Sequence, residues 1–248
     1  MPYGAPLLRV AVLSFTAVLL ATSGAAEPAA ASLDSGAERQ AAPRTQELAV
    51  LTKGQTAMAK PDNRSARLRW VERKRPITRG RTVLPVIGHR TGANGVRWLR
   101  VRLPGRPNNS TGWIRKARTV RSQTSWQLRI DLSERRVRAY HRGRLVQTFS
   151  GVIGSPATPT PRGRFFVEEN VQLTSAYVGG PYALALSARS YVLQEFAGGP
   201  GQIAVHGVWN VGGRMGTAAS HGCIRLETAP TTWLGERIGP GVPVTITA

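Results

Sequence analysis

Short runs in which apolar and polar residues alternate are the feature that most restricts how this chain can fold. Clear examples are Trp126–Leu132, Arg136–Tyr140 and Val96–Leu103. A period of two turns one face of a strand toward a core and the other toward water. Turn-forming residues separate these runs, and the chain contains 27 glycines and 17 prolines. The pattern therefore predicts a mainly β fold.

The C-terminal half contains one segment typical of a helix. Thr228 can cap a helix and Pro230 suits its first turn, so we expect a short helix that ends near Ile238. A strand over residues 244–246 should follow it. By contrast, Tyr177–Gly201 mixes Gly-Gly-Pro elements with short apolar runs, and we interpret it as a loop or lid.

The first 26 residues have the layout of a secretory signal peptide. Arg9 precedes an apolar run over residues 10–21, and small residues follow it at positions 23–26. The run is shorter than the roughly 20 residues that span a bilayer, so a retained anchor is the less favoured alternative. We expect an exported protein, in the cell wall, the periplasmic space or outside the cell. Residues 27–63, rich in Ala, Ser, Glu and Gln, are interpreted as a flexible linker.

Positive charge dominates the composition. The chain has 34 Lys and Arg against 13 Asp and Glu, a formal net charge of +21, and the basic density is highest over Arg64–Arg75. Such a surface attracts polyanions. Charge alone does not identify the polyanion, although export and the lack of a nucleic-acid-binding motif argue against nucleic acid.

Residues 64–121 are predicted to form a separate small β domain. Three motifs within them, at Val83–Val86, Trp98–Pro104 and Thr111–Ile114, resemble a bacterial SH3-like domain. The resemblance implies a small β-barrel that holds an enzyme near the cell wall, and with it we expect anionic cell-wall polymers as partners of the basic surface. A domain that only packs, with no ligand of its own, is the alternative.

The only cysteine, Cys223, lies in the stretch Thr-Ala-Ala-Ser-His-Gly-Cys-Ile-Arg-Leu-Glu. A single cysteine cannot form an intramolecular disulfide, so a free thiol, an intermolecular bridge or a metal ligand remain. A thiol nucleophile needs a base to take its proton, and His206 and His221 are close in sequence. The glycine-rich residues 212–216 between them can bring these groups together. Glycines beside Cys223 also allow backbone N–H groups to hold an oxyanion.

The motifs Val205-His-Gly and Ser220-His-Gly-Cys-Ile-Arg resemble the signature of the L,D-transpeptidase (YkuD-type) catalytic domain, and His206 precedes Cys223 by 17 residues. Thr158–Phe165 and Ile130–Val137 also match that family. The resemblance covers residues 125–248. It implies a β-sandwich or barrel with a short C-terminal helix, and it implies no cofactor and no metal.

The resemblance also implies a reaction. Cys223 would attack the carbonyl of the third residue of a peptidoglycan tetrapeptide stem and release D-alanine, with His206 as the base. His221 would orient or polarise this pair, and the N–H groups of Gly222 and Cys223 would form part of an oxyanion hole. An amine acceptor gives a 3→3 crosslink, whereas water gives carboxypeptidase activity. Carbapenem-type β-lactams would be covalent inhibitors.

The neighbouring motif residues have supporting roles in this interpretation. Gly207, Ser220 and Arg225 would place the substrate or make local hydrogen bonds, and Arg225 could instead form a salt bridge with Glu227. Two other hypotheses stay open. One is a zinc site formed by His206, His221 and Cys223, although His-x-Cys is an uncommon spacing for zinc. The other is a non-catalytic protein that binds the cell wall.

Overall fold

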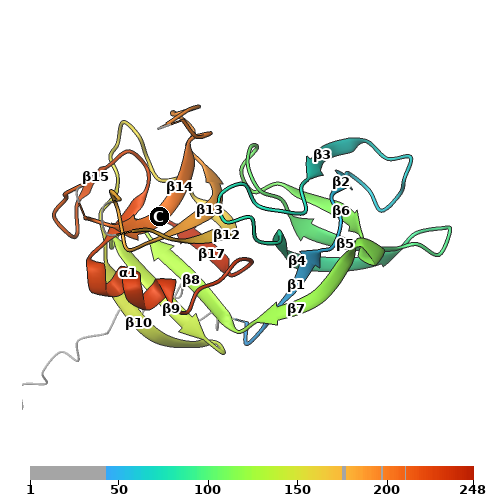
Figure 1. Cartoon of the computed structure of the whole chain (residues 1–248), viewed down its shortest axis with the longest axis horizontal. Helices are drawn as coiled ribbons and strands as arrows, with labels where there is room; N and C mark the ends of the chain where they lie inside the picture. Colours follow the sequence, from blue (N-terminus) through green and yellow to red (C-terminus); the bar gives the residue numbers. More distant parts are fainter. Residues whose placement is uncertain (1–42, 175–176, 197, 210) are drawn as a thin grey trace, which may run out of the picture. The chain divides into compact units, whose positions relative to one another are not determined.

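The structure is a computed structural model that describes residues 43–174, 177–196, 198–209 and 211–248 (Figure 1). The predicted signal peptide and the first part of the predicted linker lie outside these residues. Within the described ranges the chain is mainly β with one short α-helix, which confirms the predicted fold class. None of the helical structure described there is both long and apolar enough to cross a bilayer.

The N-terminal domain is one sheet of seven strands, in the order β3-β2-β6-β5-β4-β1-β7. Buried aliphatic residues such as Leu51, Leu84, Val101 and Ile114 form its core. Its description as SH3-like stays a prediction. The strands are β1 (Gln46–Leu51), β2 (Gln55–Met58), β3 (Arg67–Val71), β4 (Val83–Thr91), β5 (Arg97–Arg102), β6 (Thr111–Arg115) and β7 (Thr119–Thr124), with a 3-10 turn at Lys116–Arg118.

The expectation of a flexible linker up to residue 63 is wrong for the part that forms β1 and β2. β1 pairs with both β4 and β7, and β2 pairs with β3 and β6. The segment Gln46–Leu51 has little β-branched character, so its local sequence gives a weak strand signal. Its strand conformation depends on hydrogen bonds to strands far along the chain, which local patterns do not reveal.

The C-terminal domain contains a sheet of eight strands in the order β10-β9-β8-β17-β12-β13-β14-β16, and a two-stranded sheet of β11 and β15 (Figure 1). The helix α1 spans Thr228–Gly235, close to its predicted position. The strands are β8 (Trp126–Asp131), β9 (Arg136–His141), β10 (Arg144–Ser150), β11 (Ile153–Gly154), β12 (Gly163–Gln172), β13 (Tyr182–Arg189), β14 (Gln202–Gly207), β15 (Ala218–Ser220), β16 (Ile224–Leu226) and β17 (Pro243–Thr247).

The interpretation of Tyr177–Gly201 as a loop or lid is wrong for its middle part. Tyr182–Arg189 forms β13, which lies between β12 and β14. Its last six residues are all buried. A strand buried on both faces shows no alternation of apolar and polar residues, so the period-of-two pattern could not reveal it.

Strand β12 contributes to the cores of both domains. Phe165 is buried in the core of the C-terminal domain, whereas the adjacent Phe166 is buried with residues of the N-terminal core. Adjacent residues of a strand point to opposite faces, so one strand supplies both side chains. The two domains therefore share apolar packing along β12.

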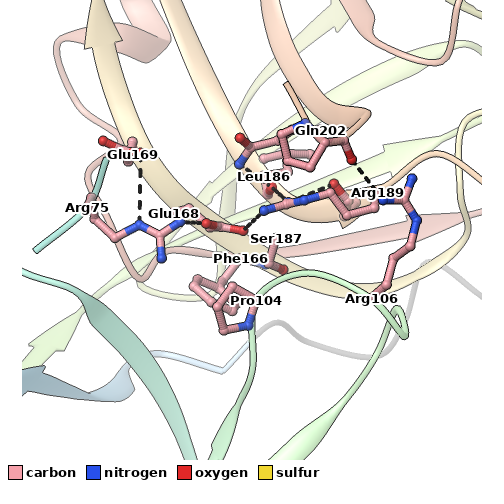
Figure 2. A network of polar contacts seen from close by, with 12 residues as sticks. Arg75, Pro104, Arg106, Phe166, Glu168, Glu169, Leu186, Ser187, Arg189 and Gln202 are labelled. Atoms are coloured by element: carbon pink, nitrogen blue, oxygen red, sulfur yellow. Dashed lines mark hydrogen bonds and ion pairs between the residues drawn. The ribbon is translucent and has the colours of Figure 1, made fainter. Parts of the chain in front are cut away.

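Charged residues also join the domains at this junction (Figure 2). Glu168 of β12 has a fully buried side chain and forms ion pairs with Arg75 of the N-terminal domain and with Arg189 of β13, the latter at 3.0 Å. Glu169 accepts hydrogen bonds from the backbone N–H and the hydroxyl of Thr78, at 2.7 and 2.8 Å. Burial lowers the pKa of Arg189 to about 10.

Candidate functional site

Two short parallel strands bring His206 and Cys223 to one face of the sheet. β14 pairs with β16 so that Val205 is opposite Ile224 and His206 is opposite Arg225. Val205 and Ile224 are buried in the core. Because side chains alternate along a strand, His206 and Arg225 point to the opposite face, and Cys223 precedes β16 on that same face. The structure thus places the histidine and the thiol that the sequence singled out on the same side of two paired strands.

The turn before Cys223 is held by Ser220. The buried Ser220 hydroxyl donates a hydrogen bond to the carbonyl of Cys223 at 2.6 Å and accepts one from the N–H of Gly222 at 3.1 Å. Gly222 has φ of +114°, a backbone conformation that disfavours a side chain. Ser220 therefore makes the local hydrogen bonds that we expected of it. The N–H of Gly222, expected in an oxyanion hole, is directed to Ser220 instead.

A second support for this turn comes from the proline-rich loop after β11. The N–H of Ser155 and the hydroxyl of Thr158 both donate to the carbonyl of Ser220, at 2.9 and 3.1 Å. The buried hydroxyl of Thr160 donates to the carbonyl of Gly222 at 2.9 Å and accepts from the N–H of Gly154 at 2.9 Å. Sequence analysis missed these residues as site components, because they lie more than 60 positions from Cys223.

Replacing Thr160 by valine should destabilise this turn. The change keeps the shape of the side chain but leaves the carbonyl of Gly222 and the N–H of Gly154 without their partner. We expect a loss of about 2 kcal/mol in the free energy of unfolding, the usual cost of such unsatisfied buried groups. Urea unfolding measures it. The matched control is Thr232→Val on the exposed face of α1, and an equal effect of the two changes would contradict this role of Thr160.

His206 is held in one tautomer. Its Nδ1 lies 2.7 Å from the carbonyl oxygen of Gly207, which can only accept, so Nδ1 carries the proton and donates it. Nε2 is then the nitrogen with the free lone pair. Burial lowers the pKa of His206 below its usual value of 6.5, against a smaller opposing effect of the hydrogen bond to Gly207. The imidazole is therefore neutral at neutral pH and can act as a base.

The thiol of Cys223 is neutral in the same conditions. Burial raises its pKa above the usual value of 9.0, and a backbone hydrogen bond from Ala204 and the charge of Arg225 only partly oppose this. A neutral thiol is a weak nucleophile until a base removes its proton. A neutral thiol and a neutral imidazole on one face form a pair suited to general-base activation.

Arg225 lies beside both groups. Its charge lowers the pKa of His206 and that of Cys223. Its guanidinium donates to the carbonyls of Val211 and Gly212, each at 3.3 Å. Arg225 thus fastens the glycine-rich loop over residues 211–216 to β16. The expected role of Arg225 in placing the substrate stays a prediction.

Gly207 is required by close packing behind His206. Its N–H donates to the carbonyl of Gly179 at 2.7 Å. A Cβ at position 207 would lie 2.0 Å from the carbonyl oxygen of Gly180, so no other residue fits there. This contact explains the glycine of the His-Gly motif by sterics, whereas we expected a role at the substrate or the oxyanion.

His221 lies at the rim of the site. The side chain is exposed, and its ring stacks on that of Phe196 with centroids 5.6 Å apart. The causes of the pKa shifts of His206 and Cys223 are burial, backbone hydrogen bonds and Arg225, without His221. The structure therefore places His221 with Phe196, a residue that sequence analysis did not single out.

The residues that the structure describes contain no group of three or more His, Cys, Asp or Glu side chains gathered closely enough to hold a metal ion. This holds for His206, His221 and Cys223 as well. The geometry gives the zinc hypothesis no support.

Comparisons with known proteins bear on the C-terminal domain. The model of the YkuD family, the L,D-transpeptidase catalytic domain, matches residues 125–246. A curated relative, the "Putative L,D-transpeptidase YkuD" of Bacillus licheniformis, is 32% identical over 122 residues, which are 49% of this chain and 66% of the relative. This chain thus spans just under two thirds of the relative's length.

Solved structures with a similar arrangement include L,D-transpeptidases from two mycobacteria. The one from Mycobacterium tuberculosis has 15% identity and a TM-score of 0.47, covering 80% of this chain and 96% of that one. The one from Mycobacterium smegmatis has 16% identity and a TM-score of 0.40, covering 66% and 99%. The family match rests on the sequence comparisons. By these, the C-terminal domain of this chain belongs to the YkuD family of L,D-transpeptidase catalytic domains.

Proposed function

We propose that this protein is an exported peptidoglycan L,D-transpeptidase that works through an acyl-enzyme on Cys223. The observation that carries the proposal is the pair formed by a neutral thiol and a neutral, tautomerically fixed imidazole on one sheet face. Membership of the YkuD family supports transpeptidase chemistry over other uses of such a pair.

The first half of the reaction forms the acyl-enzyme. Nε2 of His206 takes the proton of the Cys223 thiol as the sulfur attacks the carbonyl carbon of the third stem residue. The tetrahedral oxyanion would be held by backbone donors, among them the N–H of Cys223. The bond from that carbonyl carbon to the nitrogen of the terminal D-alanine then breaks. The imidazolium of His206 returns the proton to the departing amine, which leaves a thioester.

The second half transfers the acyl group. His206 takes a proton from an incoming amine, whose nitrogen attacks the thioester carbonyl. The C–S bond breaks, and the Cys223 thiolate regains its proton from His206. A second stem as the acceptor gives a 3→3 crosslink. Water in place of the amine gives L,D-carboxypeptidase activity, which is the second candidate.

The same thiol should react with carbapenems. The strained carbonyl of a β-lactam is an activated acyl donor, so its ring would open onto Cys223. Among the structurally similar proteins, one was solved as an avibactam carbamoyl enzyme and another in complex with imipenem. We propose carbapenem-type β-lactams as covalent inhibitors of this protein too.

The N-terminal domain would hold the enzyme near its substrate. An open cavity of about 300 Å³ on this domain is lined by residues that include Arg67, Arg115, Arg118 and the exposed Trp70. Guanidinium groups beside an exposed aromatic ring suit anionic polymers of the cell wall. We propose that this basic surface retains the protein at the wall.

Incubation of the mature protein with a purified disaccharide-tetrapeptide tests the proposed reaction, with mass spectrometry of the products and Cys223→Ala alongside. We expect a dimer that is lighter than two monomers by one alanine. The Cys223→Ala variant should give none, because no acyl-enzyme can form.

The other outcomes separate the candidates. Release of alanine without a dimer would favour the carboxypeptidase and keep the thiol mechanism. If the folded wild-type protein does not react but binds tightly to purified cell wall, the transpeptidase proposal is refuted. The protein would then be a non-catalytic wall-binding protein.

A further inference from the structure

The segment Pro104–Ser110 of the N-terminal domain reaches the chain that forms the rim of the Cys223 site. Two features anchor this segment within its own domain: Arg69 donates to the carbonyls of Pro104 and Arg106, and the N–H of Leu103 donates to the carbonyl of Ser110. These hydrogen bonds hold the backbone at Arg106 in place.

Arg106 makes three hydrogen bonds to the other domain. Its guanidinium donates to the carbonyls of Ser190, Leu193 and Pro200, each at 2.8 Å. Figure 2 shows Arg106 extending toward the C-terminal domain beside the ion pairs of Glu168. The planar guanidinium with its several donors suits such a set of carbonyls, which no other side chain could bind in the same way.

These three carbonyls belong to the segment that presents Phe196. The N–H of Ser190 donates to the carbonyl of Gly201 at 2.8 Å, which closes the two ends of this segment on each other. Gly201 has φ of +63°, and a Cβ there would lie 3.0 Å from the guanidinium of Arg106. Phe196 and Gly199 are joined by two backbone hydrogen bonds at the outer end.

Phe196 in turn stacks on His221, two residues before Cys223. A chain of contacts thus runs from Arg106, through the carbonyls of Ser190, Leu193 and Pro200, to Phe196 and the ring of His221. Phe196 is half exposed, at 51%.

A second contact from the same segment reaches the loop behind the catalytic turn. The side-chain oxygen of Asn109 accepts a hydrogen bond from the N–H of Arg164 at 2.7 Å. This is the start of β12, directly after the loop whose Thr158 and Thr160 bind the carbonyls of Ser220 and Gly222. The segment Pro104–Ser110 therefore contacts the segment that presents Phe196 and also the strand that directly follows the loop supporting the Ser-His-Gly-Cys turn.

We propose that Arg106 is a positioning residue that sets the rim of the Cys223 site through Phe196 and His221. The N-terminal domain is then a part of the catalytic unit as well as a wall anchor. The expected effect of Arg106 on the acylation of Cys223 rests on the proposed function. Its expected effect on the position of the His221 ring does not.

NMR of His221 and acylation kinetics on the full mature chain test it together. In Arg106→Ala, the ring protons of His221 should lose the ring-current shift from Phe196 and move toward their positions in Phe196→Ala. Acylation of Cys223 by a carbapenem, followed by mass spectrometry, should slow by about 10-fold, as expected for a misplaced rim. Alkylation by iodoacetamide, a small reagent that needs no rim, should keep its rate.

Arg97→Ala is the matched control, because Arg97 is an exposed arginine of β5 in the same domain. It should change neither readout. If Arg106→Ala does not fold, Arg106→Lys serves instead, since it keeps the charge and the stem but loses the planar donor set. A smaller change in the same direction is then expected.

Unchanged His221 resonances in a folded Arg106 variant would overturn the proposal. So would shifted resonances with an unaltered acylation rate, which would make the contact purely structural. If even the wild-type chain reacts with neither tetrapeptide nor carbapenem, the proposed function fails, and the His221 resonances alone decide whether Arg106 positions the rim.

Discussion

Replacing His206 by glutamine is expected to lower the rate of Cys223 acylation by about 10²- to 10⁴-fold, the usual contribution of a general base. Glutamine is close in size to histidine, but it cannot take a proton. Because burial holds the thiol neutral, loss of the base leaves almost no nucleophile at neutral pH. Mass spectrometry of the carbapenem adduct over time measures the rate.

The pH dependence of the same reaction identifies His206 as the base. The pKa of His206 is below its usual value of 6.5, so the wild-type rate should stay high as the pH falls through 6.5 and decline only when the imidazole becomes protonated. In His206→Gln this acid limb should vanish. The remaining rate should rise with pH up to and beyond 9.0, since the thiol pKa lies above that value.

His141→Gln is the matched control for these measurements. His141 stacks on Trp126 in the same domain, with ring centroids 4.5 Å apart, and makes no contribution to the shifts at His206 or Cys223. Its rate and pH profile should equal those of the wild-type protein. An acid limb that survives in His206→Gln would show that another group is the base.

The free energy of unfolding should fall by about 3–5 kcal/mol in Glu168→Ala, the cost of leaving a buried charge without its partner. Removal of this carboxylate takes from Arg189 its ion-pair partner and leaves Arg75 with Glu169 at 3.9 Å, and both arginines are largely shielded from water. Because one carboxylate pairs with arginines of both domains, its loss affects both at once. Urea unfolding followed by tryptophan fluorescence measures the change.

Glu134→Ala provides the comparison on the surface. Glu134 pairs with Arg138, but half of its side chain is exposed, and such pairs contribute little to stability. Its unfolding midpoint should scarcely move. Equal midpoints for Glu168→Ala and the wild-type chain would refute the role of Glu168 as a link between the domains.

The sequence predicts the centre of the site well because its residues are close together along the chain. Cys223 follows His206 by 17 residues, and a single strand pairing with a glycine-rich connection brings them to one face. The helix at Thr228 is equally local, since the proline of its first turn marks its start, but the expectation that Thr228 caps it is wrong: the N-cap residue is Glu227, and no side chain makes a capping hydrogen bond there. Such features depend on neighbours that a sequence pattern contains.

The surroundings of the site could not be predicted in the same way. Thr160, Arg106 and Glu168 act on groups tens of residues away. Arg106 and Glu168 belong to no recognised motif, and the stretch Thr158–Phe165 matched the family without indicating a contact between Thr160 and Gly222. Their roles depend on how the sheets pack against each other, and the periodicity of apolar residues along the sequence does not reveal that packing. Strand β13 was not predicted for a related reason. Its last six residues are buried, so it lacks the alternation of apolar and polar residues that marks a half-exposed strand.

The burial of Phe166 in the N-terminal core affects any attempt to produce the C-terminal domain alone. A chain cut after Thr124 would retain β12 but lose the N-terminal core cluster in which this ring is buried, which includes Leu84 and Val101. A phenylalanine that is 1% exposed in the whole protein would then face solvent near Glu168, which would keep its ion pair with Arg189 but lose the one with Arg75. Exposed apolar patches of this kind promote self-association, so soluble expression of the fragment calls for a polar residue at position 166.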